Sequence, residues 1–188
     1  MKIIPLHKNH LQLIAKARKN DRRAQRQLYE TFAPKMLAVC RSYIRCPDMA
    51  EEVMLYGFFK MFTHLNDFEN QGSFEGWIRR IMVNECISHL RKTSKMNFVS
   101  DDRLENTADY STEIDTELEA DEIQNLIDQL PDGYKTVFVL YVVEGYKHKE
   151  ISEMLNISEN TSKSQLFKAR KMLQEMIKNL NKISYESI

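Results

Sequence analysis

Two short helical patterns, separated by only three residues, lie in the C-terminal third of this 188-residue chain. Residues 148–155 have the apolar spacing of a helix, residues 156–158 interrupt it, and a second helical pattern begins at Glu159. Two helices joined by so short a turn cannot lie flat, so they cross and leave the second one projecting. This arrangement is typical of a helix-turn-helix, whose second helix can enter the major groove of duplex DNA.

The second of these helices has an apolar and a polar side on a wheel of about 100° per residue. The side expected to pack inward carries Ser162, Leu166, Ala169, Leu173, Met176 and Ile177. The outward side carries short polar groups followed by cations, namely Asn160, Thr161, Ser164, Lys168 and Lys171, with Lys163 and Gln165 at its margins. Short donors and acceptors suit base edges and cations suit phosphates, so these residues are candidate DNA contacts. Ser158 is the expected N-cap. A solvated helix end would give the same pattern, because helix-turn-helix units also serve as packing elements.

Glycine and proline are sparse, with five and four residues, which favours helices over turn-rich sheet folds. No stretch approaches the ~18 uninterrupted apolar residues of a membrane span. The apolar segment at the N-terminus is too short for a secretory signal.

The three cysteines, Cys40, Cys46 and Cys86, are scattered over helical patterns and are expected to be reduced thiols in a cytoplasmic protein. The histidines do not cluster with them, so we expect no metal, no cofactor and no small-molecule substrate.

The net charge of zero conceals an uneven distribution along the chain. Residues 1–47 have a balance of +9 and residues 48–95 of −1, whereas residues 96–133 have −11 and residues 134–188 have +3. A DNA-binding protein with this distribution must expose its cations locally and keep the acidic segment away from the DNA.

The first half of the chain predicts helices, with little of the alternation that marks strands. A short helix is expected over 8–19 and a longer one over 21–45, in which Pro34 either bends the helix or separates two helices. The inward residues of the longer helix are expected to be Leu28, Phe32, Met36, Leu37, Cys40 and Ile44.

A third helix is expected to begin at Asp48, because Asp48 and Glu51 have the spacing of a capping box. It should continue to about residue 65 with the apolar residues Val53, Leu55, Phe58, Phe59, Met61 and Phe62. After a loop over 66–72, Ser73 can cap a fourth helix that reaches about Lys92.

The apolar pattern fades between residues 93 and 116, where Ser, Asp, Glu, Asn and Thr dominate. Such a composition cannot bury enough apolar surface to offset the entropy of ordering, so a flexible acidic linker is expected over 96–116. Helices return over about 117–130 and, after Pro131, over 132–143. The run 137–143 is β-branched enough for a buried strand, but we prefer a helix because the helix-turn-helix needs support. The sequence thus predicts an all-α fold of two small helical domains, over 8–95 and 117–182.

A strip of polar and aromatic residues follows the fourth predicted helix. It consists of Trp77, Arg80, Asn84, Ser88 and Arg91, with Arg79 beside it and with Phe68 and Phe74 flanking the preceding loop. Aromatic rings interleaved with Arg and Asn can stack on unpaired bases and hold the backbone of a single strand. The alternative is that the aromatic rings belong to the core and the arginines are merely solvated.

Two segments of the chain resemble parts of the bacterial sigma factors of the small extracytoplasmic-function group. Residues 48–92 resemble region 2, through segments that include 48–53, 58–60, 72–85 (GSFEGWIRRIMVNE) and 89–92. Residues 128–173 resemble region 4, through segments that include 130–131, 144–146, 150–155, 157–158, 161–164 and 168–171. The two resemblances cover most of the chain and occur in the order that the family has.

The resemblance implies a non-catalytic subunit that binds core RNA polymerase and directs it to promoters. The positions that match polymerase-clamp contacts in region 2 are Asp48, Glu51, Glu52, Phe58 and Lys60. Those that match recognition and melting of the minus-ten element are the loop 68–74 with Phe68 and Phe74, and Trp77, Arg79, Arg80 and Asn84, to which we add Arg91. Those for the minus-thirty-five element in region 4 are Asn160, Thr161, Lys163, Ser164, Gln165 and Lys168, to which we add Lys171. In this family the linker passes through the channels that RNA uses, and an anti-sigma factor is a further candidate partner.

The chain departs from the family's usual pattern in both regions. The family usually has glutamine near Leu55 and an acid near Tyr56, which bears on the clamp contacts. It also usually has valine where Ser162 stands and arginine where Gln165 stands, which bears on the minus-thirty-five preference.

Two other classes of protein contain a helix-turn-helix. A free-standing repressor or activator explains residues 147–173 but leaves the basic first lobe and its aromatic strip without a role. A DNA-cutting recombinase would need a catalytic lobe with strands and a nucleophile among clustered arginines, and the sequence has no such pattern.

Overall fold

The computed structural model describes residues 6–69, 71–93 and 120–186, and the side chains of 10–69, 71–93 and 121–180. All regular structure in these ranges is helical, which confirms the expected all-α fold. The chain separates into two compact units, residues 1–93 and 94–188. The expected linker over 96–116 lies outside the described residues.

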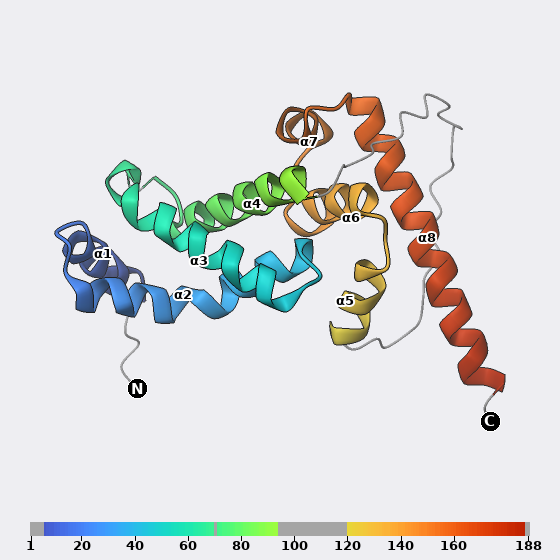
Figure 1. Ribbon diagram of the computed structural model, residues 1–188, viewed down its shortest axis with the longest axis horizontal. Coiled ribbons are helices and arrows are strands. Elements are labelled where there is room, and N and C mark those ends of the chain that lie inside the picture. The colour runs from blue at the N-terminus through green and yellow to red at the C-terminus, as the bar shows by residue number, and fades with distance from the viewer. Residues whose placement is uncertain (1–5, 70, 94–119, 187–188) are drawn as a thin grey trace. The chain divides into compact units, whose positions relative to one another are not determined.

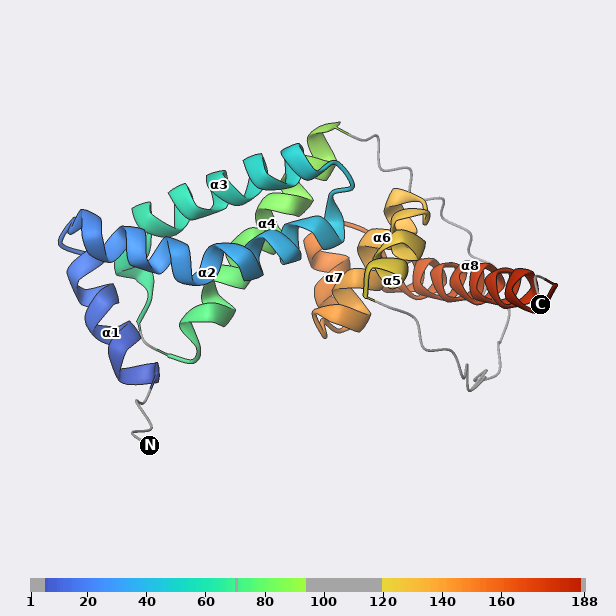
Figure 2. The same ribbon diagram turned by 90° about the horizontal axis from the view of Figure 1, so that it is seen from below.

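The first unit is a bundle of α1 (Leu6–Ala17), α2 (Arg22–Tyr43), α3 (Pro47–Thr63) and α4 (Phe74–Thr93), with a short 3-10 turn, η1 (Leu65–Asp67), before α4. Helices α2, α3 and α4 lie side by side in both views (Figures 1 and 2). Asp21 caps α2, because its Oδ1 accepts hydrogen bonds from the backbone N–H groups of Arg23 at 2.9 Å and Ala24 at 3.2 Å. Helix α2 continues through Pro34, so the proline does not divide it into two helices.

The start of α3 differs from the prediction. Pro47 is the first helical residue, Cys46 is the N-cap, and no side chain caps the helix, so the predicted Asp48–Glu51 capping box is wrong. The fixed φ of proline already favours a helix start at this position.

The buried face of α2 differs in part from the predicted one, and in α3 only some of the apolar residues are buried. In α2, Leu37 is only half-buried and Val39 is buried instead. In α3 the buried residues are Ala50, Val53, Met54, Gly57, Phe58 and Met61, whereas Leu55 and Phe59 are exposed and Phe62 is half-buried. Helix α3 has apolar residues on every side, so the sequence does not reveal which side faces the bundle.

Helices α3 and α4 approach each other closely at Gly57. A Cβ atom at this position would collide with the side chain of Met82, and would lie 3.0 Å from its Cε atom. Met82 is fully buried and occupies the space that a side chain at residue 57 would need. The absence of a side chain at Gly57 therefore sets the separation of the two helices.

The second unit contains α5 (Ala120–Asp128), α6 (Asp132–Phe138), a turn of π-helix, η2 (Val139–Val143), α7 (His148–Leu155) and α8 (Glu159–Glu186). The preference for a helix over a strand in residues 137–143 is thus confirmed, with a widened last turn. A buried ion pair joins α5 to α6, since Lys135 Nζ lies 2.6 Å from Asp128 Oδ1 and Lys135 is 1% exposed.

The helix-turn-helix has the predicted limits. Helix α7 ends at Leu155, its C-cap Asn156 turns the chain through a left-handed backbone (φ 55°), and α8 begins at Glu159. Asparagine tolerates this conformation better than most residues. Ser158 caps α8 as predicted, because its Oγ accepts a hydrogen bond from the Thr161 N–H at 2.9 Å.

Candidate nucleic-acid interface

The predicted strip on α4 lies on the outside of the first unit. Arg80, Asn84 and Ser88 are exposed, and Trp77 is half-buried at the start of the helix. Ser73 caps this helix as expected, with its Oγ 3.4 Å from the Gly76 N–H. Arg79 is half-buried and Arg91 is exposed, and both already interact with other groups of the chain. The strip therefore presents a guanidinium group, an amide and the accessible part of an indole along one side of α4.

Phe68 and Phe74 do not share this exposure. They are 4% and 6% exposed, and their ring centroids lie 5.0 Å apart. The expectation that both rings are available to stack on bases is wrong for the free protein, because they pack against each other and Phe74 packs against Phe32 at 5.5 Å. Their role in the structure is to hold Trp77, whose ring lies 5.4 Å from Phe68 and 5.7 Å from Phe74.

Arg18 at the end of α1 also holds the loop before α4. Its Nε donates a hydrogen bond to the Leu65 carbonyl at 3.1 Å, and its Nη2 donates to the Phe68 carbonyl. The sequence does not predict this contact, because Arg18 and Phe68 are 50 residues apart and Arg18 belongs to no motif. Arg18, Phe68 and Phe74 together give Trp77 a fixed support.

The predicted polymerase contacts fall into two groups. Asp48, Glu51 and Glu52 are exposed on α3, whereas Phe58 is 2% exposed and packs edge-on against Tyr29 at 4.8 Å. Phe58 is therefore a core residue, and the expectation that it contacts a partner conflicts with its burial.

Lys60 forms an ion pair with another residue of the first unit. Its Nζ lies 2.7 Å from Glu85 Oε1 on α4 and 5.2 Å from the centroid of the Tyr56 ring. The hydrogen bond to Glu85 is the main cause that raises the pKa of Lys60 above its ordinary value. Glu85 is only 8% exposed, so this ion pair fastens α3 to α4.

An exposed apolar surface on α3 lies beside these residues. Leu55, Tyr56 and Phe59 are 48%, 54% and 64% exposed, and we call them the α3 apolar face. The rings of Tyr56 and Phe59 stack with centroids 6.3 Å apart. A hollow of 340 Å³ adjoins Phe59 and is bordered by Phe62 and by Arg18, which directly follows α1. Exposed apolar side chains that cluster in this way are typical of interaction surfaces.

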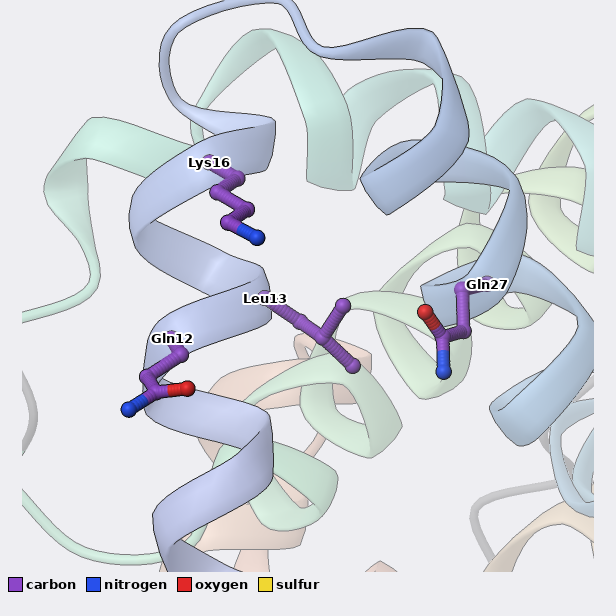
Figure 3. Close-up of a pocket in the computed structure, with 4 residues that line it drawn as sticks. All are labelled: Gln12, Leu13, Lys16 and Gln27. Carbon is purple, nitrogen blue, oxygen red and sulfur yellow. The ribbon is translucent and has the colours of Figure 1, made fainter.

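A second hollow lies between α1 and α2 (Figure 3). Its volume is 140 Å³, and it is lined by Gln12, Leu13, Lys16 and Gln27. Sites for small molecules usually have about 300–1,000 Å³ and are mostly apolar, so this hollow is too small and too polar for one. Among the residues that the structure describes, no group of three or more His, Cys, Asp or Glu side chains could hold a metal ion. In the same ranges, no helix combines the length and the apolar character needed to cross a bilayer.

The candidate contacts on α8 divide by exposure. Asn160, Lys163 and Lys171 are exposed and Lys168 is half-buried, as the wheel predicts. The outward placement of Thr161 and Ser164 and the placement of Gln165 at the margin are wrong, because these residues are 8%, 7% and 1% exposed.

Local hydrogen bonds and helical spacing explain these differences. Thr161 Oγ1 lies 2.8 Å from Ser158 Oγ, and Ser164 Oγ donates to the Thr161 carbonyl at 3.0 Å. Gln165 lies three residues after Ser162 and four before Ala169, so it shares their inward row. Its Oε1 atom is buried without a hydrogen-bond partner among the described residues.

His148 lies at the first position of α7, against α8, and was not predicted as a site residue. Its Nδ1 lies 2.9 Å from Ser162 Oγ, and its ring stacks on Tyr141 with centroids 4.5 Å apart. Burial is the main cause that lowers the pKa of His148, and the cations Lys163 and Arg170 lower it further, against an opposing effect of Glu159. No sequence motif marks this contact, because it depends on how α7 crosses α8.

The comparisons with known proteins agree with this arrangement of two units. Residues 28–96 match the family model described as Sigma-70 region 2, and residues 120–173 match the one described as Sigma-70, region 4. The chain is 26% identical over 184 residues to the ECF RNA polymerase sigma factor SigW of Bacillus subtilis, covering 89% of this chain and 96% of SigW. It is 24% identical over 180 residues to the ECF RNA polymerase sigma-E factor of Haemophilus influenzae, covering 89% and 95%.

Solved structures with the same fold include two complexes. CnrH in complex with the cytosolic domain of CnrY matches with a TM-score of 0.50 and 20% identity, over 89% of this chain and 96% of that one. The sigma factor RpoE in complex with the anti-sigma factor NepR from Bartonella quintana matches with a TM-score of 0.53 and 21% identity, over 81% and 96%. At these identities the likeness concerns the fold.

Proposed function

The chain belongs to the extracytoplasmic-function group of the sigma-70 family and directs promoter-specific transcription, and we propose that it does so by dividing promoter recognition between its two units. In this proposal residues 8–95 act as region 2, residues 117–182 act as region 4, and residues 96–116 connect them. In this proposal the protein catalyses no reaction itself, because core RNA polymerase supplies the chemistry. The protein acts in the cytoplasm together with that enzyme. A free-standing repressor or activator is not favoured, since both sigma regions match in one chain.

The observation that carries the proposal is the exposed strip on α4 beside a rigidly supported Trp77. Separating a duplex costs about 1.4 kcal/mol per base-pair step in lost stacking. A protein offsets this cost only if it binds the separated strand better than the duplex, and each base stacked on an aromatic ring contributes roughly 1–3 kcal/mol. We assign stacking to Trp77 and contacts to the minus-ten strand to Arg80 and Asn84, with Arg79 and Arg91 at the margin.

Region 4 recognises the minus-thirty-five element in this proposal. Asn160 and Lys163 stand exposed in the first turns of α8, where a recognition helix meets base edges and phosphates. Lys168 and Lys171 follow further along and suit phosphate contacts. Thr161 and Ser164 contribute to base recognition only if DNA binding uncovers them, so we rank them below the exposed residues.

Core polymerase binds the first unit at α3. The α3 apolar face would supply the buried centre of the interface, and the exposed carboxylates of Asp48, Glu51 and Glu52 would supply its charged rim. Two related structures are complexes, one of CnrH with the cytosolic domain of CnrY and the other of RpoE with the anti-sigma factor NepR. By analogy, we propose an anti-sigma factor as a second partner for this chain.

The test reconstitutes the full chain with core polymerase on a promoter found by mapping transcription start sites after overexpression. Arg80→Ala and Asn84→Ala should leave polymerase binding unchanged and lower the permanganate reactivity of minus-ten thymines by roughly tenfold, as expected for a lost contact of about 1.4 kcal/mol. Arg26→Ala removes an exposed cation from α2 and serves as the matched control. Unchanged thymine reactivity in both variants would contradict the role of the strip. Failure of the wild-type chain to bind core polymerase would contradict the whole proposal.

A further inference from the structure

His148 connects three elements of the second unit. It begins α7, its ring stacks on Tyr141 of η2 at 4.5 Å and an interplanar angle of 25°, and its Nδ1 meets Ser162 Oγ of α8 at 2.9 Å. Ser162 has no exposed surface, and its hydroxyl has this histidine as its hydrogen-bond partner. Helices α7 and α8 therefore meet through a directed polar contact, and both helices also bury apolar residues, namely Ile151, Leu155, Leu166 and Ala169.

A hydrogen bond constrains two helices differently from apolar packing. Apolar contacts tolerate small rotations of a helix about its axis, because the attraction between the atoms has no preferred direction. A hydrogen bond weakens steeply when its angle or distance changes. The bond from His148 to Ser162 consequently resists rotation of the first turns of α8, where Asn160 and Lys163 are exposed two residues before and one residue after Ser162.

We propose that the His148–Ser162 hydrogen bond is a positioning pair that sets the orientation in which α8 presents Asn160 and Lys163 to the minus-thirty-five element. The inference rests on the proposed function of α8 as the recognition helix. The pair touches no base itself, so it acts on sequence preference through the geometry of its neighbours. Tyr141 completes the arrangement by fixing the plane of the imidazole ring, and the Arg170 guanidinium lies 5.9 Å from the centroid of the same tyrosine ring.

Burial is the main cause that favours the neutral ring of His148, and the charges around it also contribute. Lys163 and Arg170 on α8 oppose a positive charge there, Glu159 on the same helix supports one, and Tyr141 presents an uncharged ring from η2. A neutral imidazole has one donor and one acceptor nitrogen. Its Nδ1 can therefore either accept a hydrogen bond from the Ser162 hydroxyl or donate one to it, and the link persists near neutral pH.

The test compares two variants of nearly the same shape. Ser162→Thr keeps the hydroxyl, and Ser162→Val replaces it with a methyl group, so both add the same bulk to the buried site. Polymerase holoenzymes that contain each full-length variant would be selected on a promoter library with a constant minus-ten element and a randomised upstream hexamer. We expect Ser162→Thr to keep the wild-type preference among upstream hexamers. Ser162→Val should discriminate between these hexamers roughly tenfold less than the wild type, which is the size of effect that one buried hydrogen bond supports.

A double variant separates positioning from stability. His148→Phe keeps a ring on Tyr141, and His148→Phe combined with Ser162→Val leaves no polar atom of the pair unpaired. Replacing both partners of a hydrogen bond with apolar groups of similar shape is often nearly neutral for stability. We expect the double variant to melt near the wild-type temperature and still to show the lowered discrimination. Wild-type discrimination in either the valine variant or the double variant would overturn the inference. A wild-type holoenzyme that enriches no upstream sequence would overturn the role of α8 in recognition, which is a separate result.

Discussion

At the scale of single residues, contacts between distant side chains decide what is available for binding. Phe68 and Phe74 have the residue type expected of base-stacking groups, yet both are buried and support Trp77. Gln165 and Ser164 have polar side chains on the recognition helix, yet both are buried. Residue type alone gives the chemistry of a site, whereas exposure depends on packing that a single sequence does not reveal.

The protonation of His148 leads to a prediction for stability. Burial and the nearby cations lower its pKa in the folded chain below the ordinary value of about 6.5. The unfolded chain therefore binds more protons at mildly acidic pH, so His148 lowers the stability of the fold as the pH falls below about 6.5. We expect the melting temperature of the wild type to fall more than that of His148→Phe between pH 7.5 and 5.5. Calorimetry or circular dichroism at matched ionic strength measures this difference. An equal decline in the two proteins would show that His148 does not titrate with folding.

At the scale of helices, the contact between α3 and α4 rests on the pair Gly57 and Met82. Gly57→Ala places a methyl group against the buried Met82 side chain and should destabilise the chain by about 1–3 kcal/mol, the usual cost of overpacking. Met82→Ala should destabilise by about 2–5 kcal/mol through the cavity that it leaves. The double variant should be more stable than the sum of these two changes implies, because the new methyl group occupies part of the cavity.

Denaturant unfolding of the four proteins in this cycle measures the coupling between the two positions. Gly76→Ala is the matched control, since a Cβ there meets only Ser73 Cβ at 3.8 Å and the residue is an exposed part of α4. That change should be neutral or slightly stabilising. Strictly additive effects at residues 57 and 82 would contradict the proposed cause of the close approach.

The α3 apolar face gives a prediction for partner binding. Leu55→Ala should weaken the affinity of the chain for core polymerase by roughly fivefold to tenfold, and Phe59→Ala by more, because truncating buried interface anchors costs over about 1 kcal/mol each. Leu11→Ala is a close control, since Leu11 on α1 is also 48% exposed but lies on another helix. Competition with a labelled sigma factor measures the affinity. An equal effect of Leu11→Ala and Leu55→Ala would remove the case for α3 as the docking surface.

The positions of the helices could be predicted from the sequence, and their buried faces only in part. Periodicity and the caps Ser73 and Ser158 gave the starts of α4 and α8 correctly. Periodicity does not identify the buried face of α3, because apolar residues surround the helix and two of them, Leu55 and Phe59, are exposed. The ion pair of Lys60 with Glu85 and the contact of His148 with Ser162 could not be predicted, because each joins two helices whose crossing is set by the whole bundle.

At the scale of the whole molecule, the chain joins a region 2 unit and a region 4 unit with a net charge of zero. The basic N-terminal segment, with a balance of +9, offsets residues 96–133, with −11. Within that range, the connector over 96–116 has a balance of −5. An acidic connector is repelled by DNA phosphates, so we expect it to stay away from the promoter while the two units bind. The connector would then contribute through its length, because it holds the second unit near DNA that the first unit has already located.

Cutting the chain between its two units tests this contribution. A protease site inserted near residue 105 allows the purified protein to be compared before and after cleavage, with the same amino acids present in both samples. The cut first unit should still bind core polymerase. The stimulation of transcription by the minus-thirty-five element should fall by roughly a hundredfold or more at nanomolar protein, because the second unit loses the high effective concentration that the connection provides. Raising the concentration of the free second unit should restore the stimulation. If cut and uncut proteins used the upstream element equally well at nanomolar concentration, the connection would have no role in promoter recognition, and polymerase alone would bring the two units together.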